Sequence, residues 1–250
     1  MKRITGPMHR YGEADFDKDY LRWGLHDAET QAKEAESILR IAGADRRLRI
    51  LDLACGTGLH ATHWAKQGHA VTGVDLSETL IAQARARMLQ EGVSVDFIVS
   101  DIRDLVCHKT YDVVTWIENS FFDDDVINHM RQYLTGGGCF VLDVRNPENP
   151  KAKFRQGNWR TWREENGVFY LERHETDGQT DVHEDAWITI DPQRELIEER
   201  VNTTERSMTL DQKIHAMKTA GFDPVELRTM EGGLFGGGPE PYWLWLVGRR

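Results

Sequence analysis

Two glycines and one aspartate are the residues whose types and spacing point most directly to chemistry. Gly56 and Gly58 follow the apolar run 48–54, which predicts a buried strand, and they precede a predicted helix. Glycine adopts backbone angles that other residues avoid, so a ligand can approach the main chain and face the amides of the helix start. Asp75 ends a second predicted strand, where a carboxylate can accept hydrogen bonds from both hydroxyls of a ribose. The pattern therefore predicts a nucleotide-cofactor site.

Two classes of cofactor fit this pattern: a nicotinamide or flavin dinucleotide, and S-adenosylmethionine (SAM). Ala61 replaces the third glycine of G-x-G-x-x-G, and Asp52 lies inside the first strand, four residues before Gly56. Dinucleotide enzymes usually begin the glycine turn directly at the strand end, without an acid inside the strand. The string LDLACGTG followed by VTGVD resembles the cofactor motifs of class I SAM-dependent methyltransferases. The resemblance implies SAM as the cofactor.

The length, net charge and cysteine content of the chain restrict the kinds of partner that the protein can bind. Its 250 residues carry a formal net charge of −10, which disfavours nucleic acid because a phosphate backbone needs a basic surface. The three cysteines lack C-x-x-C spacing, as is typical of a reducing compartment. No apolar stretch approaches the ~20 residues of a membrane span, and no signal-peptide pattern follows Met1. We expect a cytoplasmic protein with a small-molecule partner, no nucleic acid, membrane or metal partner, and homo-oligomerisation left open.

Strands and helices alternate through the first 150 residues. We expect helices at 27–42, 58–67, 78–90 and 124–134, the last ended by Gly136-Gly137-Gly138, and strands at 48–54, 70–75, 94–99, 111–117 and 139–144. This alternation predicts a doubly wound, mainly parallel α/β sheet with ligands at the carboxyl ends of the strands.

A different pattern follows residue 150, where four β-prone segments separated by turns predict an inserted antiparallel sheet. Helix 209–220 and strands 224–229 and 242–247 return to the first pattern. Residues 1–25 are rich in charge and aromatics and contain no apolar strand. We expect a seven-stranded Rossmann-like methyltransferase core with an antiparallel β cap. The predicted parts are an N-terminal lid and lead-in helix (1–42), a SAM-binding core (43–149), a cap over the acceptor (150–207), and a helix and strands completing the core (208–250).

The family resemblance implies the cofactor contacts. Asp101 follows the strand 94–99 and resembles the acid that accepts the adenine amino group, with Ile102 packing on the ring; a solvated loop aspartate is the alternative. Ile117 would face the adenine or the sulfonium arm. The other implied cofactor residues are Tyr11, Ala54, Gly56, Gly58, Asp75 and Leu76.

Two further strings resemble the glycine N-methyltransferases, whose layout related amino-sugar N-methyltransferases share. Ile117-Glu118-Asn119-Ser120-Phe121-Phe122 resembles their L-G-N-S-F string, and Leu142-Asp143-Val144-Arg145-Asn146 resembles their I-D-H-R-N string. The resemblance covers roughly residues 10–150. It implies that Tyr11 lies beside the reacting methyl group and that Asn119 and Arg145 hold the acceptor, Arg145 through a carboxylate. An ion pair between Arg145 and Glu118 is the alternative.

Other residues complete the candidate site. Phe121 and Trp23 would exclude water from the reaction, Phe121 as one of the catalytic residues with Tyr11 and Glu118. Tyr20 and Trp23 would contact the acceptor. Glu118 stands where the family has glycine, so it is either a contact near the reacting groups or a solvated loop end. The acids 123–125 either suit a cationic acceptor or complement the positive end of a helix. Trp159, Trp162 and Trp187 either line a substrate pocket or belong to a core.

The sequence is compatible with three functions. The first is a small-molecule N-methyltransferase. The second is an O-methyltransferase with the same cofactor site. The third is a non-catalytic SAM-binding regulator, which Arg145 and the aromatic N-terminal segment disfavour.

Overall fold

A computed structural model describes residues 1–7, 17, 21, 28–117, 124–149, 160–176, 183–204 and 209–250. The chain divides into two compact units. The larger unit joins His26–Asn146 to Thr209–Arg250, and the smaller unit joins Met1–Leu25 to Pro147–Met208. Each unit is described by itself below.

The larger unit is built on a seven-stranded sheet with the order β11-β12-β6-β5-β2-β3-β4. Every neighbouring pair from β6 to β4 is parallel, whereas β12 runs antiparallel to both of its neighbours. The predicted doubly wound, mainly parallel sheet of seven strands is therefore confirmed. The strands are β2 (Arg49–Leu53), β3 (Ala70–Asp75), β4 (Asp96–Val99), β5 (Tyr111–Trp116), β6 (Leu134–Arg145), β11 (Val225–Thr229) and β12 (Trp243–Arg249).

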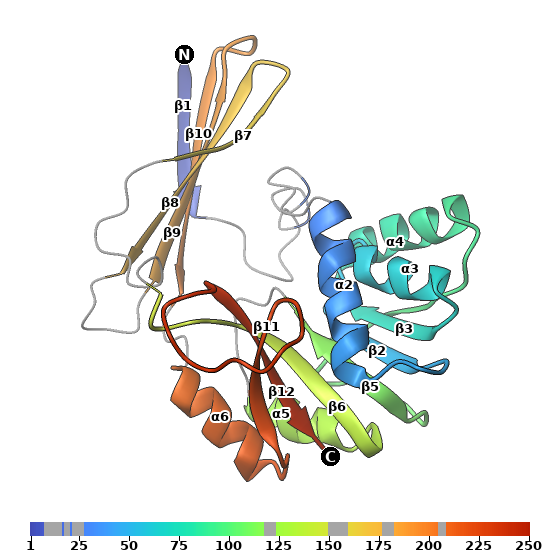
Figure 1. Ribbon diagram of the computed structural model, residues 1–250. Coiled ribbons are helices and arrows are strands. Elements are labelled where there is room, and N and C mark those ends of the chain that lie inside the picture. Colours follow the sequence, from blue (N-terminus) through green and yellow to red (C-terminus); the bar gives the residue numbers. More distant parts are fainter. Residues whose placement is uncertain are drawn as a thin grey trace. The chain divides into compact units, whose positions relative to one another are not determined.

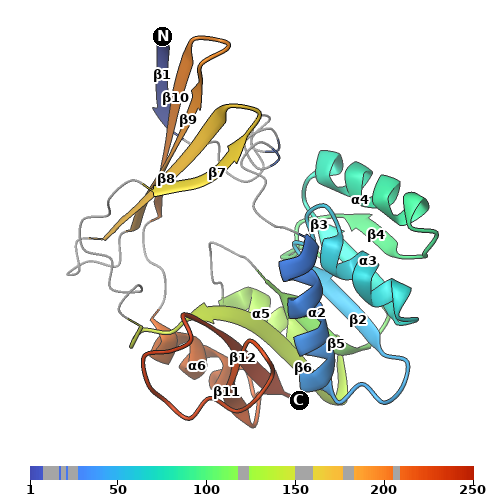
Figure 2. The same cartoon turned by 45° about the horizontal axis from the view of Figure 1, so that its top comes forward.

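Helices cover both faces of this sheet (Figures 1 and 2). One group consists of α2 (Ala28–Ala42), α3 (Leu59–Lys66) and α4 (Glu78–Gln90), and the other of α5 (Asp124–Arg131) and α6 (Leu210–Thr219). Two buried tryptophans attach α2 to its neighbours: the Trp64 indole donates to the Ala35 carbonyl at 3.1 Å, and the Trp245 indole donates to the Ser37 hydroxyl at 3.0 Å. A large apolar ring with its one polar atom satisfied is the usual solution for a core.

The glycine run 136–138 differs from its prediction. Helix α5 ends at Arg131, and the glycines lie inside strand β6 instead of ending the helix. Gly137 has φ 81°, its amide donates to the Arg250 carbonyl at 2.8 Å, and the Arg250 amide donates to the Gly138 carbonyl at 3.0 Å. A left-handed residue inside a strand favours glycine, so this run serves the pairing of the sheet with the end of the chain.

The smaller unit is a five-stranded sheet with the order β1-β10-β9-β8-β7. Strands β7 (Arg160–Glu165), β8 (Val168–Thr176), β9 (His183–Asp191) and β10 (Leu196–Thr204) are successively antiparallel. The predicted antiparallel sheet is thus confirmed.

The N-terminal segment, for which the sequence predicts no apolar strand, begins with a strand of mixed composition. Lys2–Pro7 form strand β1, which pairs in parallel with β10. The Arg3 guanidinium lies 2.8 Å from the Glu199 carboxylate, and the Lys2 amide donates to the Glu195 carbonyl at 2.6 Å. Partners almost 200 residues away stabilise this segment, so its own pattern of apolar residues could not predict the strand.

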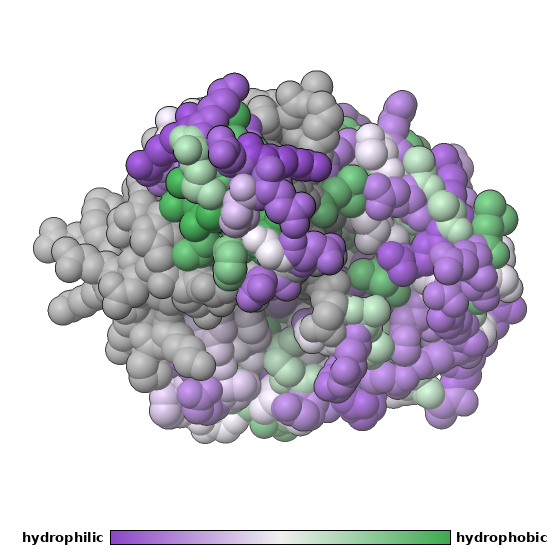
Figure 3. Space-filling model, turned by 90° about the horizontal axis from the view of Figure 1, so that it is seen from above, coloured by the Kyte–Doolittle hydropathy of each residue, from purple (hydrophilic) through white to green (hydrophobic). Residues whose placement is uncertain are grey.

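On the face drawn in Figure 3, most of the described residues are hydrophilic, with clusters of hydrophobic residues between them. No helix in the described part of the chain has the length and apolar character needed to cross a bilayer.

We predict that Gly73→Ala in β3 destabilises the larger unit. A Cβ there would lie 2.8 Å from the Phe97 ring and 2.9 Å from the Cys55 sulfur, inside their contact distances. The free energy of unfolding should fall by ~1–3 kcal/mol, the usual cost of overpacking. Denaturant unfolding measures this change. Gly136→Ala is the matched control because a Cβ at Gly136 meets nothing within 4 Å. Equal effects of the two substitutions would contradict the prediction.

Candidate functional site

The carboxyl ends of four parallel strands meet at one edge of the larger sheet. Leu53 at the end of β2 is opposite Val74 of β3 and Trp116 of β5. Asp75 is opposite Val99 of β4, and its carbonyl accepts from the Ser100 amide at 2.9 Å. The loops that follow these strands therefore start side by side, where α/β proteins bind their ligands.

The glycine turn connects β2 to α3 through left-handed backbone. Ala54, Gly56 and Gly58 have φ of 51°, 53° and 71°. A Cβ on Gly58 would lie 2.7 Å from the Phe97 ring, so glycine is required there by packing as well as by backbone angle. The Cys55 amide donates to the Val74 carbonyl at 3.0 Å, which ties the turn to the end of β3. These three implied cofactor residues therefore form one turn of left-handed backbone.

Asp75 holds this turn in place. Its side chain is buried, with 2% of its surface exposed. One carboxylate oxygen accepts from the Gly56 amide at 2.8 Å, and the other accepts from the Ser77 amide at 2.9 Å. Each carboxylate oxygen has two acceptor sites, so these bonds are compatible with further bonds from a ribose. Asp75 thus joins the glycine turn to the start of α4, whose N-cap is Ser77.

A second buried acid, Asp52, lies near the same turn. It accepts from the Thr115 hydroxyl at 2.8 Å, which joins β2 to β5. Burial raises the pKa of the neighbouring Cys55 thiol well above its usual value, and the negative charges of Asp52 and Asp75 raise it further. Cys55 is therefore a protonated packing residue. Asp52, the acid inside the otherwise apolar strand β2, is thus a buried charge close to the glycine turn.

Asp101 follows β4 and forms a bidentate pair with Arg103. The Arg103 Nε lies 2.9 Å from one carboxylate oxygen, and the Arg103 backbone amide donates to the same oxygen at 2.9 Å. The side-chain bonds from Arg103 lower the pKa of the Asp101 carboxyl, so it is an ionised acceptor. Next to it Ile102 is buried, as is Ile117 after β5, while Leu76 is half-buried. The predicted cofactor residues of the described chain therefore gather at the carboxyl edge.

Arg145 ends strand β6 at the same edge of the sheet. It is directly opposite Trp243 of β12, and its guanidinium carbon lies 5.6 Å from the centre of the Trp243 ring. A guanidinium over an indole face is a favourable cation–π pair. The adjoining Asn146 is buried, and its carboxamide donates to the Gly238 and Pro241 carbonyls at 3.0 and 2.9 Å. Asn146 therefore secures the glycine-rich loop that leads to Trp243.

A lysine from helix α6 belongs to the same charged group. Burial lowers the pKa of the Lys213 ammonium; the charge of Asp143 raises this pKa and the charge of Arg145 lowers it. Two cations and one acid therefore interact near the end of β6. Sequence reasoning identified Arg145 but missed Trp243 and Lys213, because neither lies in a recognisable string.

Several predicted site residues lie outside the described part of the chain. They are Tyr11, Tyr20, Trp23, Glu118, Asn119, Phe121 and Trp159. Trp162 lies on β7 of the smaller sheet. Trp187 lies on β9 of the smaller sheet and is half-buried.

Known proteins share the sequence of the core. Residues 50–138 match the family described as a methyltransferase domain. A ubiquinone biosynthesis O-methyltransferase of Pseudomonas aeruginosa is 31% identical over 149 residues, which make up 56% of this chain and 64% of that protein. A protein of the same description from Rickettsia canadensis is 42% identical over 103 residues, or 40% of this chain and 44% of that protein. The chain spans less than two thirds of the length of these curated relatives.

Solved structures share the fold over nearly the whole chain. The CcbJ methyltransferase of Streptomyces caelestis has a TM-score of 0.75 and 21% identity, covering 93% of this chain and 95% of that one. A SAM-bound amino pentose methyltransferase of Micromonospora echinaspora has a TM-score of 0.67 and 23% identity, covering 97% and 100%. The family match over residues 50–138 includes the glycine turn and Asp75, the acid that holds it. The sheet order of the larger unit is consistent with this match. Residues 50–138 of this chain form a methyltransferase domain.

Proposed function

We propose that this protein is an enzyme that transfers the methyl group of SAM to the amine nitrogen of a small molecule. The acceptor classes are an amino acid, an amino sugar or a natural-product intermediate. The observation that carries the proposal is the glycine turn at the carboxyl edge, held by the buried Asp75 carboxylate. The fold shared with an amino pentose methyltransferase over 97% of the chain supports an amine as the nucleophile.

The proposed cofactor contacts follow from the groups that meet at this edge. Asp75 accepts hydrogen bonds from the ribose hydroxyls, and Asp101, which is ionised, accepts one from the adenine amino group. Ile102 packs on the adenine ring. Further contacts are assigned to Tyr11, Ala54, Gly56, Gly58, Leu76 and Ile117.

SAM supplies an electrophilic methyl group when it is bound. Because the acceptor nitrogen must lie in line with the methyl–sulfur bond at ~3 Å, positioning by the protein supplies much of the rate. With a neutral amine as acceptor, the positive charge of the sulfonium would be dispersed between sulfur and nitrogen during transfer, so a site that excludes water would favour the reaction. We assign Tyr11, Phe121 and Glu118 to the surroundings of the methyl group. The proton of an ammonium acceptor can leave through water, so the reaction requires no dedicated base.

We assign the acceptor to Arg145 and the residues around it. The Arg145 guanidinium is held over Trp243, and a fixed guanidinium can bind a carboxylate through two parallel bonds. Lys213 adds a second positive charge near the end of β6. Because Asp143 offsets only one of these two positive charges, the remaining charge favours an acceptor that carries an anionic group beside its amine. Tyr20, Trp23 and Asn119 are the other proposed acceptor contacts.

An O-methyltransferase is the second candidate. Its support is the description of the curated relatives as ubiquinone biosynthesis O-methyltransferases, which match up to 56% of this chain.

Turnover of methyl-labelled SAM with a set of primary and secondary amines and a set of phenols separates the two candidates. We expect label in amine products, and most strongly in amines that carry a carboxylate. Label confined to phenols would replace the proposal by the O-methyltransferase, and no turnover with SAM binding intact would favour a SAM-binding regulator.

We predict that Asp75→Ala weakens SAM binding by ~2–4 kcal/mol, because two charge-assisted hydrogen bonds to the ribose are lost. Calorimetry on the purified variant measures the affinity. Because Asp75 also holds the Gly56 and Ser77 amides, the free energy of unfolding without SAM should fall as well. Asp75→Asn keeps the shape of the side chain and serves as the second variant if Asp75→Ala unfolds. Asp96→Ala removes an exposed acid paired with Lys109 and is the control. Unchanged SAM affinity in both folded Asp75 variants would refute the assignment.

We predict that Arg145→Lys raises the KM for the acceptor or lowers kcat while SAM affinity stays nearly constant. Lysine keeps the charge but loses the planar fork and its stacking on Trp243. Steady-state kinetics at saturating SAM give this comparison. Arg228→Lys, at an arginine paired with Glu226 on β11, is the control. Loss of SAM affinity with normal acceptor kinetics would place Arg145 in the cofactor site.

A further inference from the structure

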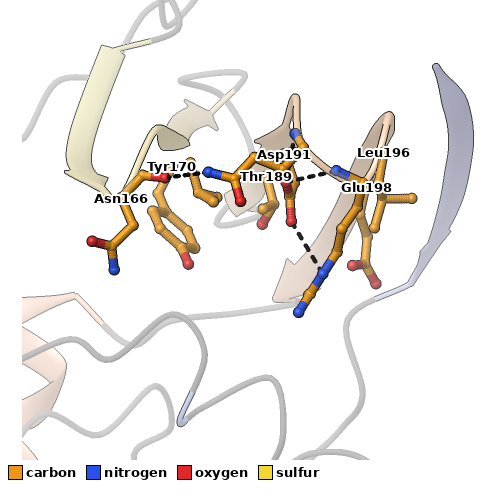
Figure 4. A pocket seen from close by; sticks show the side chains of 9 residues that line it. Asn166, Tyr170, Thr189, Asp191, Leu196 and Glu198 are labelled. Atoms are coloured by element: carbon orange, nitrogen blue, oxygen red, sulfur yellow. Dashed lines mark hydrogen bonds and ion pairs between the residues drawn. The ribbon is translucent and has the colours of Figure 1, made fainter.

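A hollow lies on one face of the smaller sheet, within that unit alone. Its volume is about 740 Å³. Strand residues and the two turns 166–167 and 192–195 surround it, and their side chains are drawn in Figure 4. The lining combines an aromatic ring, hydroxyl and carboxylate groups, and two aliphatic residues, Val168 and Leu196.

The strand register explains why these groups share one face. Tyr170 of β8 is opposite Thr189 of β9, and Thr189 is opposite Glu198 of β10. Residues directly opposite one another in a sheet project to the same side. A ring, a hydroxyl and a carboxylate therefore form a row across three strands, with Asp191 in the next row along β9.

The two acids of the hollow are both balanced by guanidinium groups. Glu198, with 7% of its surface exposed, lies 2.6 Å from Arg200. Asp191 accepts from the backbone amides of Gln193 and Arg194 at 3.1 Å each, and its other oxygen lies 3.6 Å from the Arg194 side chain. The hollow therefore offers polar atoms without an excess of charge, which favours a neutral ligand over a simple ammonium.

One polar group in the lining points to a hydroxyl-bearing ligand. The Thr189 side chain has 1% of its surface exposed, and its hydroxyl has no hydrogen-bond partner among the described residues. Buried hydroxyls normally find a partner, because an unsatisfied one costs free energy. A hydroxyl both donates and accepts, so a ligand hydroxyl would satisfy it.

We propose that this hollow binds a neutral ring compound with several hydroxyl groups, such as a sugar ring. Thr189 exchanges a hydrogen bond with one ligand hydroxyl, and the Glu198 carboxylate accepts from another. Tyr170, Val168 and Leu196 contact the C–H surface of the ring. None of the residues that line the hollow is among those assigned above to the cofactor or the acceptor, so this proposal does not depend on the methyl-transfer function.

The test uses the full chain without SAM, with methyl α-D-glucopyranoside and ethylammonium chloride as probes. Titration followed by NMR of the labelled protein should show saturable shifts with the glucoside in residues 166–170, 189–194 and 196–198, and none with the ammonium salt. Thr189→Val keeps the shape and removes the hydroxyl, so it should weaken the glucoside affinity by about fivefold.

Thr5→Val is the matched control, since Thr5 is an exposed threonine of β1 opposite Glu199, one residue out of the row that holds Glu198. Thermal unfolding shows that both variants are folded. If Thr189→Val fails to fold, Tyr170→Leu removes the ring contact and should also weaken the glucoside affinity. No binding of the glucoside, equal affinity in the variants and the native protein, or tighter binding of the ammonium salt would each overturn the proposal.

Discussion

The position of the glycine turn depends on one buried carboxylate. Asp75 accepts the Gly56 amide on one oxygen and the Ser77 amide on the other, so a single side chain joins the ends of β2 and β3 and the start of α4. Both amides are donors that an apolar residue would leave unsatisfied in a buried place. The acid is therefore a structural part of the turn before any cofactor arrives, and the site is largely formed in advance.

The core could be predicted from the sequence because its signals are local. The apolar run before Gly56, the acid at the end of 70–75 and the helical pattern of 78–90 each lie within a few residues, and the structure places these elements as predicted. The prediction for the glycines at 136–138 was wrong because glycine is common both at helix ends and in irregular strands. The hydrogen bonds to Arg250, far along the chain, are what place these glycines in a strand. The strand at 2–7 escaped notice because its stability comes from β10, far along the chain.

The acceptor site could be predicted only in part. Arg145 was identified because it lies in a sequence string that resembles the glycine N-methyltransferases. Its stacking on Trp243 depends on the register between β6 and β12, which the sequence does not predict. The same is true of Lys213, which helix α6 brings to the end of β6. The row of Tyr170, Thr189 and Glu198 also requires the register of three strands, and a shift of one residue would turn its members to the other face. These features are properties of pairing, so residue types alone could not predict them.

The pairing of β1 with β10 affects the order in which strands can pair while the chain is being synthesised. Ile4 must wait for Glu198 before it has a neighbour, whereas β2, β3 and β5 can associate once residue 116 has been made. Strand β1 therefore leaves the ribosome before β2, β3 and β5 but can pair only after β10 has been made. Contacts of such long sequence separation form slowly, and an unpaired strand is prone to associate with other chains in the meantime. The N-terminal segment therefore stays unpaired while β2, β3 and β5 can already associate, and it gains its partner before β11 and β12 complete the larger sheet.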